Sequence, residues 1–296
     1  MKHTAALETV FVDVPDAALE AYEAALGTVC TTVGFFRDDR AEKWRVEGVK
    51  PVGVGEADLQ AALFLAGAIS GIAATLMRTA TAAEGWLART RASFPEQSIG
   101  NRFVVRGTHL GGPAAPGRIT LVLDAGLAFG SGEHGSTRGC LRALEFLAHR
   151  HPRRILDMGT GSGILAIAAA RLLRRRVLAT DIEPWSIRVS RENAAQNAVK
   201  NLVRCRLANG WHDPFVRAHG PYDLVLANIL ARPLCAMAKS LACHLAPGGA
   251  VILSGLLATQ ARMVLAAHRP HGLLLARVLR EGAWTTLVLV KRNGRA

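Results

Sequence analysis

The segment RRILDMGTGSGILAIAAARLLRRRVLATDIE, residues 153–183, constrains the fold of this chain more than any other stretch. In it an apolar run is followed by Gly159, Gly161 and Gly163, then by an apolar helical pattern, and a second apolar run ends at Asp181. Glycines after a strand let the backbone come close to a ligand, and the free N–H groups of a following helix attract an anionic group. The segment therefore predicts a strand–loop–helix–strand unit that holds a nucleoside.

The same unit discriminates between two nucleoside cofactors. Asp181 is expected at the carboxyl end of the second strand, where a carboxylate can accept hydrogen bonds from both hydroxyls of a ribose. The dinucleotide-binding fingerprint requires a further glycine at the position of Ile164. These features predict that the unit binds S-adenosylmethionine, and they argue against an NAD-dependent oxidoreductase. The alternative is a tight strand-to-helix turn followed by an ordinary capping aspartate.

The net charge of +13 is concentrated in one part of the chain. Residues 1–95 contain 9 Lys and Arg against 12 Asp and Glu, a net charge of −3, whereas residues 96–296 contain 27 against 11, a net charge of +16. A strongly basic surface is typical of contact with nucleic acid or a ribonucleoprotein. The alternative is that the basic runs at 149–154 and 171–176 are solvated or complement helix ends. The unequal charges favour two partners of different charge.

The cysteines and the apolar stretches indicate where such a chain works. Five cysteines are scattered without CxxC spacing, and the ten histidines form no metal-binding pattern. This usage predicts a reducing cytoplasm and no metal site, and no secretory signal is recognisable at the start of the sequence. The uncharged stretch 59–77 is rich in alanine and contains Gly67 and Gly71. We therefore expect a helix over 58–66, a turn and a strand over 73–78 there, and no membrane span.

The order of the predicted elements divides the chain into two domains. Residues 1–83 show the pattern β-α-β-β-α-β of a small ferredoxin-like α+β domain, with a first helix over 16–27 that Asp16 caps. A helical linker is expected over 84–97. Residues 98–296 alternate strands and helices, which predicts a Rossmann-like, doubly wound α/β domain.

The end of the second domain indicates which class of α/β protein this is. Strands are predicted over 273–280 and 284–292, and the short turn between them makes the pair antiparallel. A parallel sheet finished by an antiparallel hairpin is typical of class I methyltransferases and not of dehydrogenases. Before the hairpin we expect one helix over 234–245, a turn over 247–249 and a strand over 250–254.

A second glycine-rich segment, LDAGLAFGSGEHGSTRGCLRALEFL at 123–147, is expected to face the same ligand. Ser136 and Thr137 begin a helix whose N-terminus suits a carboxylate, such as that of a methionine moiety. The alternative is an ordinary capped helix after a loop. Glu133 and His134 could form an acid–base pair, but neighbouring polar side chains on a loop are more often solvated, so their role stays open.

The segment VLANIL, 225–230, places Asn228 at the carboxyl end of a central strand, in the crevice where α/β sheets bind ligands. Methyl transfer to an amine requires a deprotonated nitrogen held about 3 Å from the methyl group. An amide oxygen can accept the amine N–H bonds and stabilise the positive charge that develops on nitrogen. We therefore expect Asn228 to position the amine. The alternative is an asparagine that only ends a strand.

Six segments resemble, in this order, the bacterial PrmA family, the methyltransferases of ribosomal protein L11. They are DAGLAFGSGEHGSTRGCL, ILDMGTGSGILAIAA, ATDIEP, RENAAQNAV, DLVLANILARPL and LAPGGAVILSG. The resemblance covers about residues 86–296, and the part before it matches more in pattern than in residues. The AFGSGEH loop and the Asn-Ile-Leu sequence are specific to that family, whereas GxGxG is common to such methyltransferases. Ser131 stands where the family usually has Thr, and Gly135 and Ser136 replace a common Pro-Thr.

The resemblance implies a function and a set of binding residues. Thr137, Gly159, Asp181 and Asn228 would contact S-adenosylmethionine, and the N-terminal domain would recognise the protein substrate. The enzyme would methylate amino groups, on lysine side chains or the α-amine, of a large-subunit ribosomal protein in the cytoplasm. A transient contact with rRNA through the basic domain is a further expectation, and no membrane is involved.

Two other functions stay open at this point. An RNA base N-methyltransferase is the main alternative, and the basic part of the chain favours it. Enzymes that methylate an extruded base follow the strand-end asparagine with Pro-Pro-aromatic to stack that base, whereas Ile229 and Leu230 follow Asn228 here. A non-catalytic module that binds RNA or the ribosome would keep the fold but would not bind the cofactor.

Overall fold

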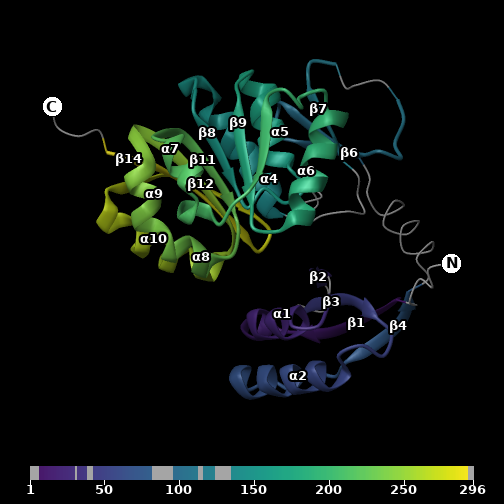
Figure 1. Ribbon diagram of the computed structural model, residues 1–296. Coiled ribbons are helices and arrows are strands. Elements are labelled where there is room, and N and C mark those ends of the chain that lie inside the picture. Colours follow the sequence, from purple (N-terminus) through teal and green to yellow (C-terminus); the bar gives the residue numbers. More distant parts are fainter. Residues whose placement is uncertain are drawn as a thin grey trace. The chain divides into compact units, whose positions relative to one another are not determined.

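The computed structural model describes residues 7–30, 32–38, 43–81, 96–112, 116–123 and 135–292 (Figure 1). The chain divides into two compact units, Met1–Thr90 and Arg91–Ala296. The helical linker predicted within 84–97 falls almost entirely outside the described residues, so the domain boundaries at 83 and 97 stay predictions.

The first unit is a four-stranded antiparallel sheet with two helices. Its elements are β1 (Leu7–Val14), η1 (Asp16–Ala18), α1 (Leu19–Gly27), β2 (Thr32–Asp38), β3 (Lys43–Pro51), α2 (Glu56–Ser70) and β4 (Met77–Thr81). The strand order is β2-β3-β1-β4, and all neighbouring strands are antiparallel. Buried and partly exposed residues alternate along β1, as expected for a sheet with one face on a core. The predicted ferredoxin-like fold is confirmed.

Three local predictions in this unit are wrong. Asp16 does not cap the first helix, because its carboxylate accepts a hydrogen bond from the indole Nε1 of the buried Trp44 at 2.7 Å. The second helix is longer than 58–66: it continues through Gly67 to Ser70 and ends at Gly71, whose φ of +69° suits a glycine. The following strand accordingly starts at Met77 rather than near residue 73.

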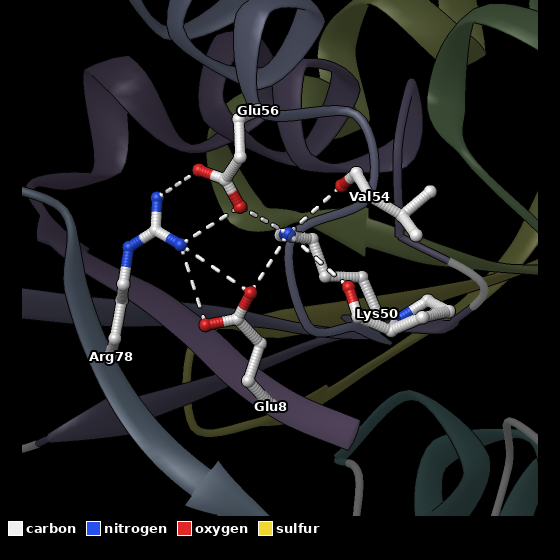
Figure 2. Close-up of polar contacts among 6 residues, drawn as sticks. Glu8, Lys50, Val54, Glu56 and Arg78 are labelled. Carbon is white, nitrogen blue, oxygen red and sulfur yellow. Dashed lines mark hydrogen bonds and ion pairs between the residues drawn. The ribbon is translucent and has the colours of Figure 1, made fainter. Parts of the chain in front are cut away.

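A buried ion-pair cluster connects β1, β3, α2 and β4 of the first unit (Figure 2). The Lys50 side chain is 0% exposed, and its ammonium lies 2.8 Å from Glu8 Oε1 and 2.5 Å from Glu56 Oε1. It also donates to the carbonyl of Val54 at 2.9 Å, and Arg78 contacts both carboxylates. Hydrogen bonds from Lys50 lower the pKa of Glu8, and those from Arg78 and Lys50 lower the pKa of Glu56 to about 2. Each buried charge therefore has an opposite charge beside it.

We expect Lys50→Met to reduce the stability of the first unit by about 3 kcal/mol, because one partner of a buried ion pair is removed while Glu8 stays buried. Native-state hydrogen exchange of the β1 and β3 amides in the full chain measures this local stability. Lys43→Met is the matched control, since Lys43 lies on the same strand and is exposed. An equal loss in both variants would contradict a role of the buried cluster.

The second unit contains a seven-stranded sheet. Its strands are β8 (Ile155–Met158), β9 (Val177–Asp181), β10 (Val203–Leu207), β11 (Tyr222–Asn228), β12 (Leu245–Leu257), β13 (Leu273–Glu281) and β14 (Trp284–Lys291). Their order is β10-β9-β8-β11-β12-β14-β13, and only the pairs that include β14 are antiparallel. The predicted Rossmann-like sheet and its final hairpin are confirmed. A small sheet of β5 (Gln97–Ile99), β6 (Phe103–Gly107) and β7 (Ile119–Leu123) precedes it.

Helices cover both faces of the large sheet (Figure 1). One layer consists of α4 (Gly135–Leu147), α5 (Ile164–Leu173) and α6 (Pro184–Gln196). The other consists of α7 (Pro214–Ala218), α8 (Ala231–Ala236), α9 (Ala238–His244) and α10 (Ala261–His268). Successive buried strand residues face opposite layers: Ile155 packs in the first core and Leu156 in the second. Within the described part of the chain, every helix is too short or too polar to cross a bilayer.

Two predictions in the second unit are corrected. The helix predicted over 234–245 is two short helices, α8 and α9, that meet at Met237. The turn predicted over 247–249 belongs to the start of β12, whose pairing with β11 is irregular between Tyr222 and Leu224. The pattern of apolar residues encodes neither the helix break at Met237 nor the irregular strand pairing.

Candidate functional site

The glycine loop after β8 has the backbone conformation that its sequence predicts. Gly159, Gly161 and Gly163 have φ angles of +72°, +53° and +83°, a region that other residues rarely adopt. The amides of Gly159 and Thr160 donate to the carbonyl of Thr180 at 2.8 and 2.9 Å, and the amide of Gly163 donates to Thr160 O at 2.8 Å. The loop is therefore held against the end of β9, and it ends where α5 begins.

The position of Gly159 leaves no room for a side chain. A Cβ there would overlap with Cγ2 of Ile229, the residue that follows β11. At Gly163 a Cβ would lie 3.0 Å from Ser190 Cβ and 3.1 Å from Ser190 Cα on α6. Ile229 and α6 thus pack closely against the loop at Gly159 and Gly163. Without side chains at these positions, backbone atoms can line a ligand site.

Asp181 ends β9 beside this loop. Its Oδ2 accepts a hydrogen bond from the Gly161 amide at 2.9 Å, and its Oδ1 accepts one from the Glu183 amide at 3.0 Å. A carboxylate has about four acceptor positions, so each oxygen keeps capacity for another donor. The backbone therefore orients a half-buried carboxylate at the carboxyl edge of the sheet.

Asn228 and Thr137 come together although 91 positions separate them in the sequence. The Asn228 amide nitrogen donates to Thr137 Oγ1 at 3.4 Å. Thr137 is fully buried in the first turn of α4, and Ser254 Oγ donates to the neighbouring Ser136 carbonyl at 3.1 Å. Because Ser254 pairs with Asn228 across β11 and β12, the N-terminus of α4 is attached to the strand end that carries the asparagine.

These contacts join the six predicted site residues into one connected region. Thr137 contacts Asn228, Ile229 packs under Gly159, and Gly161 contacts Asp181. Glu133 and His134, with the loop over 124–134, lie outside the described residues, so their role stays open.

One residue of the region was not predicted from the sequence. Asp157 lies on β8, two residues before Gly159, and is 1% exposed. Its Oδ2 accepts hydrogen bonds from Thr160 Oγ1 at 2.6 Å and from the Ala166 amide at 3.1 Å, which connects both ends of the glycine loop. Its Oδ1 has no partner among the described residues. Burial raises the pKa of Asp157 to about 7. An acidic residue within an otherwise buried strand, directly before GxGxG, is the signal that could have identified it.

We expect Asp157 to make the stability of the second unit depend on pH. Its pKa is about 7 in the folded chain and about 4 when unfolded, so the folded state favours the protonated form and stability falls as pH rises from about 4 to 7. Asp157→Asn cannot ionise but keeps an acceptor for Thr160, so this decrease should be absent. Thermal unfolding of both chains between pH 4 and 8 measures it, and parallel curves would contradict the assignment.

The fold and this region define a class I S-adenosylmethionine-dependent methyltransferase: the sheet order, the antiparallel β14 and the glycine loop at the end of β8 occur together. The chain belongs to the ribosomal protein L11 methyltransferase family. A sequence model described as "Ribosomal protein L11 methyltransferase (PrmA)" matches residues 56–292.

Individual relatives agree with this assignment. The ribosomal protein L11 methyltransferase of Bradyrhizobium diazoefficiens is 48% identical over 221 residues, 74% of this chain and 75% of the relative. That of Rhodopseudomonas palustris is 46% identical over 220 residues, 74% of each chain. The crystal structure of the ribosomal protein L11 methylase from Lactobacillus delbrueckii subsp. bulgaricus has a TM-score of 0.61 and 31% identity, and the match covers 67% of this chain and 99% of that one.

Proposed function

We propose that this chain transfers methyl groups from S-adenosylmethionine to amino groups of a large-subunit ribosomal protein. The acceptor nitrogens are lysine side chains, the α-amine or both. The observation that carries the proposal is the Asn228–Thr137 contact at the carboxyl edge of the sheet, directly beside the glycine loop. The names of the curated relatives support a ribosomal protein as the substrate.

The residues present fit the cofactor. The closely packed Gly159 leaves a backbone surface without side chains, and the Asp181 carboxylate keeps acceptor capacity for the hydroxyls of a ribose. Gly161 and Gly163 shape the same loop, and Thr137 is placed at a helix N-terminus that favours a carboxylate. When bound, S-adenosylmethionine supplies a methyl group on a sulfonium, which the amine nitrogen takes as the carbon–sulfur bond breaks and a thioether remains.

Asn228 supplies the acceptor that orients the amine. Because its amide nitrogen donates to Thr137, its Oδ1 is left as the acceptor, and none of the described residues donates to it. A lysine amine must first lose its proton to water, since its reference pKa is about 10.4. The oxygen can then hold the N–H groups so that the nitrogen lone pair faces the methyl group.

The side chains after Asn228 argue against RNA base methylation. Ile229 packs under Gly159, and Leu230 is an aliphatic residue that is 49% exposed. Neither offers the aromatic face on which an extruded base is stacked. Incubation with tritiated cofactor and dissociated ribosomal components tests this point, because the label should appear on protein and not on RNA.

All residues proposed for methyl transfer belong to the second unit. We therefore propose that the first unit recognises the protein substrate. The enzyme would then act in the cytoplasm, where its substrate is available. Residues 96–296, with a net charge of +16, suit a transient contact with rRNA.

Asp181→Ala should weaken the binding of S-adenosylmethionine by roughly 10- to 100-fold, since hydrogen bonds to a charged acceptor contribute about 1.5–3 kcal/mol each. Equilibrium binding to the purified variant measures this, and thermal unfolding checks that it is folded. Glu183→Ala is the matched control: it removes the same charge from an exposed neighbour. Unchanged affinity in folded Asp181→Ala would refute the ribose assignment.

Asn228→Ala should lower turnover about 10²–10³-fold with a smaller effect on cofactor affinity, because the lost acceptor acts on the way to the transition state. Single-turnover rates at saturating substrate, measured from pH 7 to 9, should also rise with pH in the wild type. Asn201→Ala, at an exposed turn on the other edge of the sheet, serves as the control. Near-full turnover of Asn228→Ala would leave the residue with a structural role only.

A further inference from the structure

A strongly basic surface lies at the edge of the large sheet opposite to the glycine loop. Arg153 and Arg154 directly precede β8, and the run 174–176 directly precedes β9. Together with residues that line two adjoining cavities, they form what we call the amino-edge patch. Its members are Arg102, His149, Arg150, His151, Arg153, Arg154, Arg174, Arg175 and Arg176, all of them exposed.

The positive charge of the patch is not neutralised by the described residues. Two carboxylates line its cavities, Glu145 and Asp223. Glu145 accepts from the Asn101 amide at 3.1 Å, and Asp223 Oδ2 accepts from the amides of Arg153 and Arg154 at 2.8 and 2.9 Å. Among the ion pairs of the described residues, none includes an arginine of the patch. Arg150 donates to the Gly248 carbonyl at 2.6 Å and Arg154 to the Gly220 carbonyl at 3.5 Å. Because a guanidinium carries five N–H donors, these two arginines and the other five keep donors for an anionic partner.

The patch is concave. Arg150, His151 and Arg153 line a cavity of about 270 Å³, and Arg102, His149 and Arg175 line a second one of about 390 Å³. Both cavities include His151, so they adjoin. One water occupies about 30 Å³ of liquid, so each cavity has room for a phosphate group.

Helix ends alone do not account for this surface. Charges complement a helix dipole only within its last turn, and Arg102, Arg153 and Arg154 belong to no helix end. In addition, His151 and Arg174 have φ angles of +48° and +53° at helix C-terminal positions, where glycine is the usual residue. Basic side chains therefore stand at two positions that backbone geometry favours for glycine.

We infer that the amino-edge patch binds the phosphate backbone of RNA. Arginine presents a planar fork of donors that fits phosphate oxygens, and several exposed guanidinium groups on one surface can contact several phosphates of one strand. The patch is a docking surface and not a catalytic one: Arg176 directly precedes β9 and Asp181 ends it, and the five residues of β9 span about 17 Å. The inference rests on the proposed function in that it gives the rRNA contact of a ribosomal-protein methyltransferase a defined location.

The test measures the salt dependence of binding to a labelled 20-nucleotide single-stranded RNA by fluorescence anisotropy, with the full chain. The variant is Arg102→Ala combined with Arg153→Ala and Arg175→Ala, which changes both cavities. The control is Arg188→Ala combined with Arg262→Ala and Arg280→Ala, three exposed arginines outside the patch. Both variants lose the same net charge.

We expect the slope of log K against log salt to decrease by about 2 in the patch variant, since each phosphate contact to a single strand contributes about 0.7. The control should keep the wild-type slope. No binding of the wild type at 50 mM salt, an equal decrease in both variants, or equally tight binding of poly-glutamate would overturn the inference. Unchanged cofactor affinity checks the fold of both variants.

A second measurement separates this inference from the proposed function. Methyl transfer to the free ribosomal protein, without RNA, should be equal in the wild type and the patch variant. If the wild type fails to methylate that protein while the RNA slopes differ as expected, the proposed function fails and the RNA surface stands. If methyl transfer succeeds and the slopes do not differ, only the RNA surface fails.

Discussion

The close packing of Gly159 on Ile229 is the constraint on which the rest of the site depends. It holds the end of β8 against the residue after β11, and the amide hydrogen bonds to Thr180 hold the same turn against β9. Three strand ends thereby meet at one loop, so that a backbone surface, a carboxylate and an amide come from three different strands. A side chain at Gly159 would separate the strands that the site brings together.

In the described part of the chain, buried charged groups are fully paired in the first unit but not in the second. Around Lys50 every charged group has a partner, so the cluster joins four elements without leaving an unpaired charge. Asp157 instead has a buried oxygen without a partner among the described residues, and its pKa is raised. A buried carboxylate with an unpaired oxygen costs stability, and such groups typically occur beside functional sites. The first arrangement stabilises a scaffold, and the second organises a site.

The sequence predicted what periodicity and glycine spacing encode: the four-stranded and seven-stranded sheets, the final hairpin and the strand-end positions of Asp181 and Asn228. The small sheet of β5, β6 and β7 was not predicted. It did not predict what depends on a partner distant in the chain. Asp16 is a residue type that often caps helices, but its carboxylate instead accepts a hydrogen bond from the indole of Trp44 on β3. The break between α8 and α9 at Met237 was not predicted either, since neither glycine nor proline occurs at that position. The sequence placed Thr137 and Asn228 at one ligand site, but it did not predict the hydrogen bond between their side chains.

Because the central strands are parallel, the two edges of the sheet carry different side chains. Their carboxyl ends carry two half-buried polar groups: Asp181, which accepts from backbone amides, and Asn228, whose side chain donates to that of Thr137. Their amino ends carry an excess of exposed arginines, where long side chains meet solvent. A polyanion attracted to the amino ends is thus kept about one strand length from the region proposed for methyl transfer. Because the field of exposed charges decays over roughly 10 Å in salt, the basic edge can attract RNA without repelling the positive charge of an amine-bearing substrate at the opposite edge.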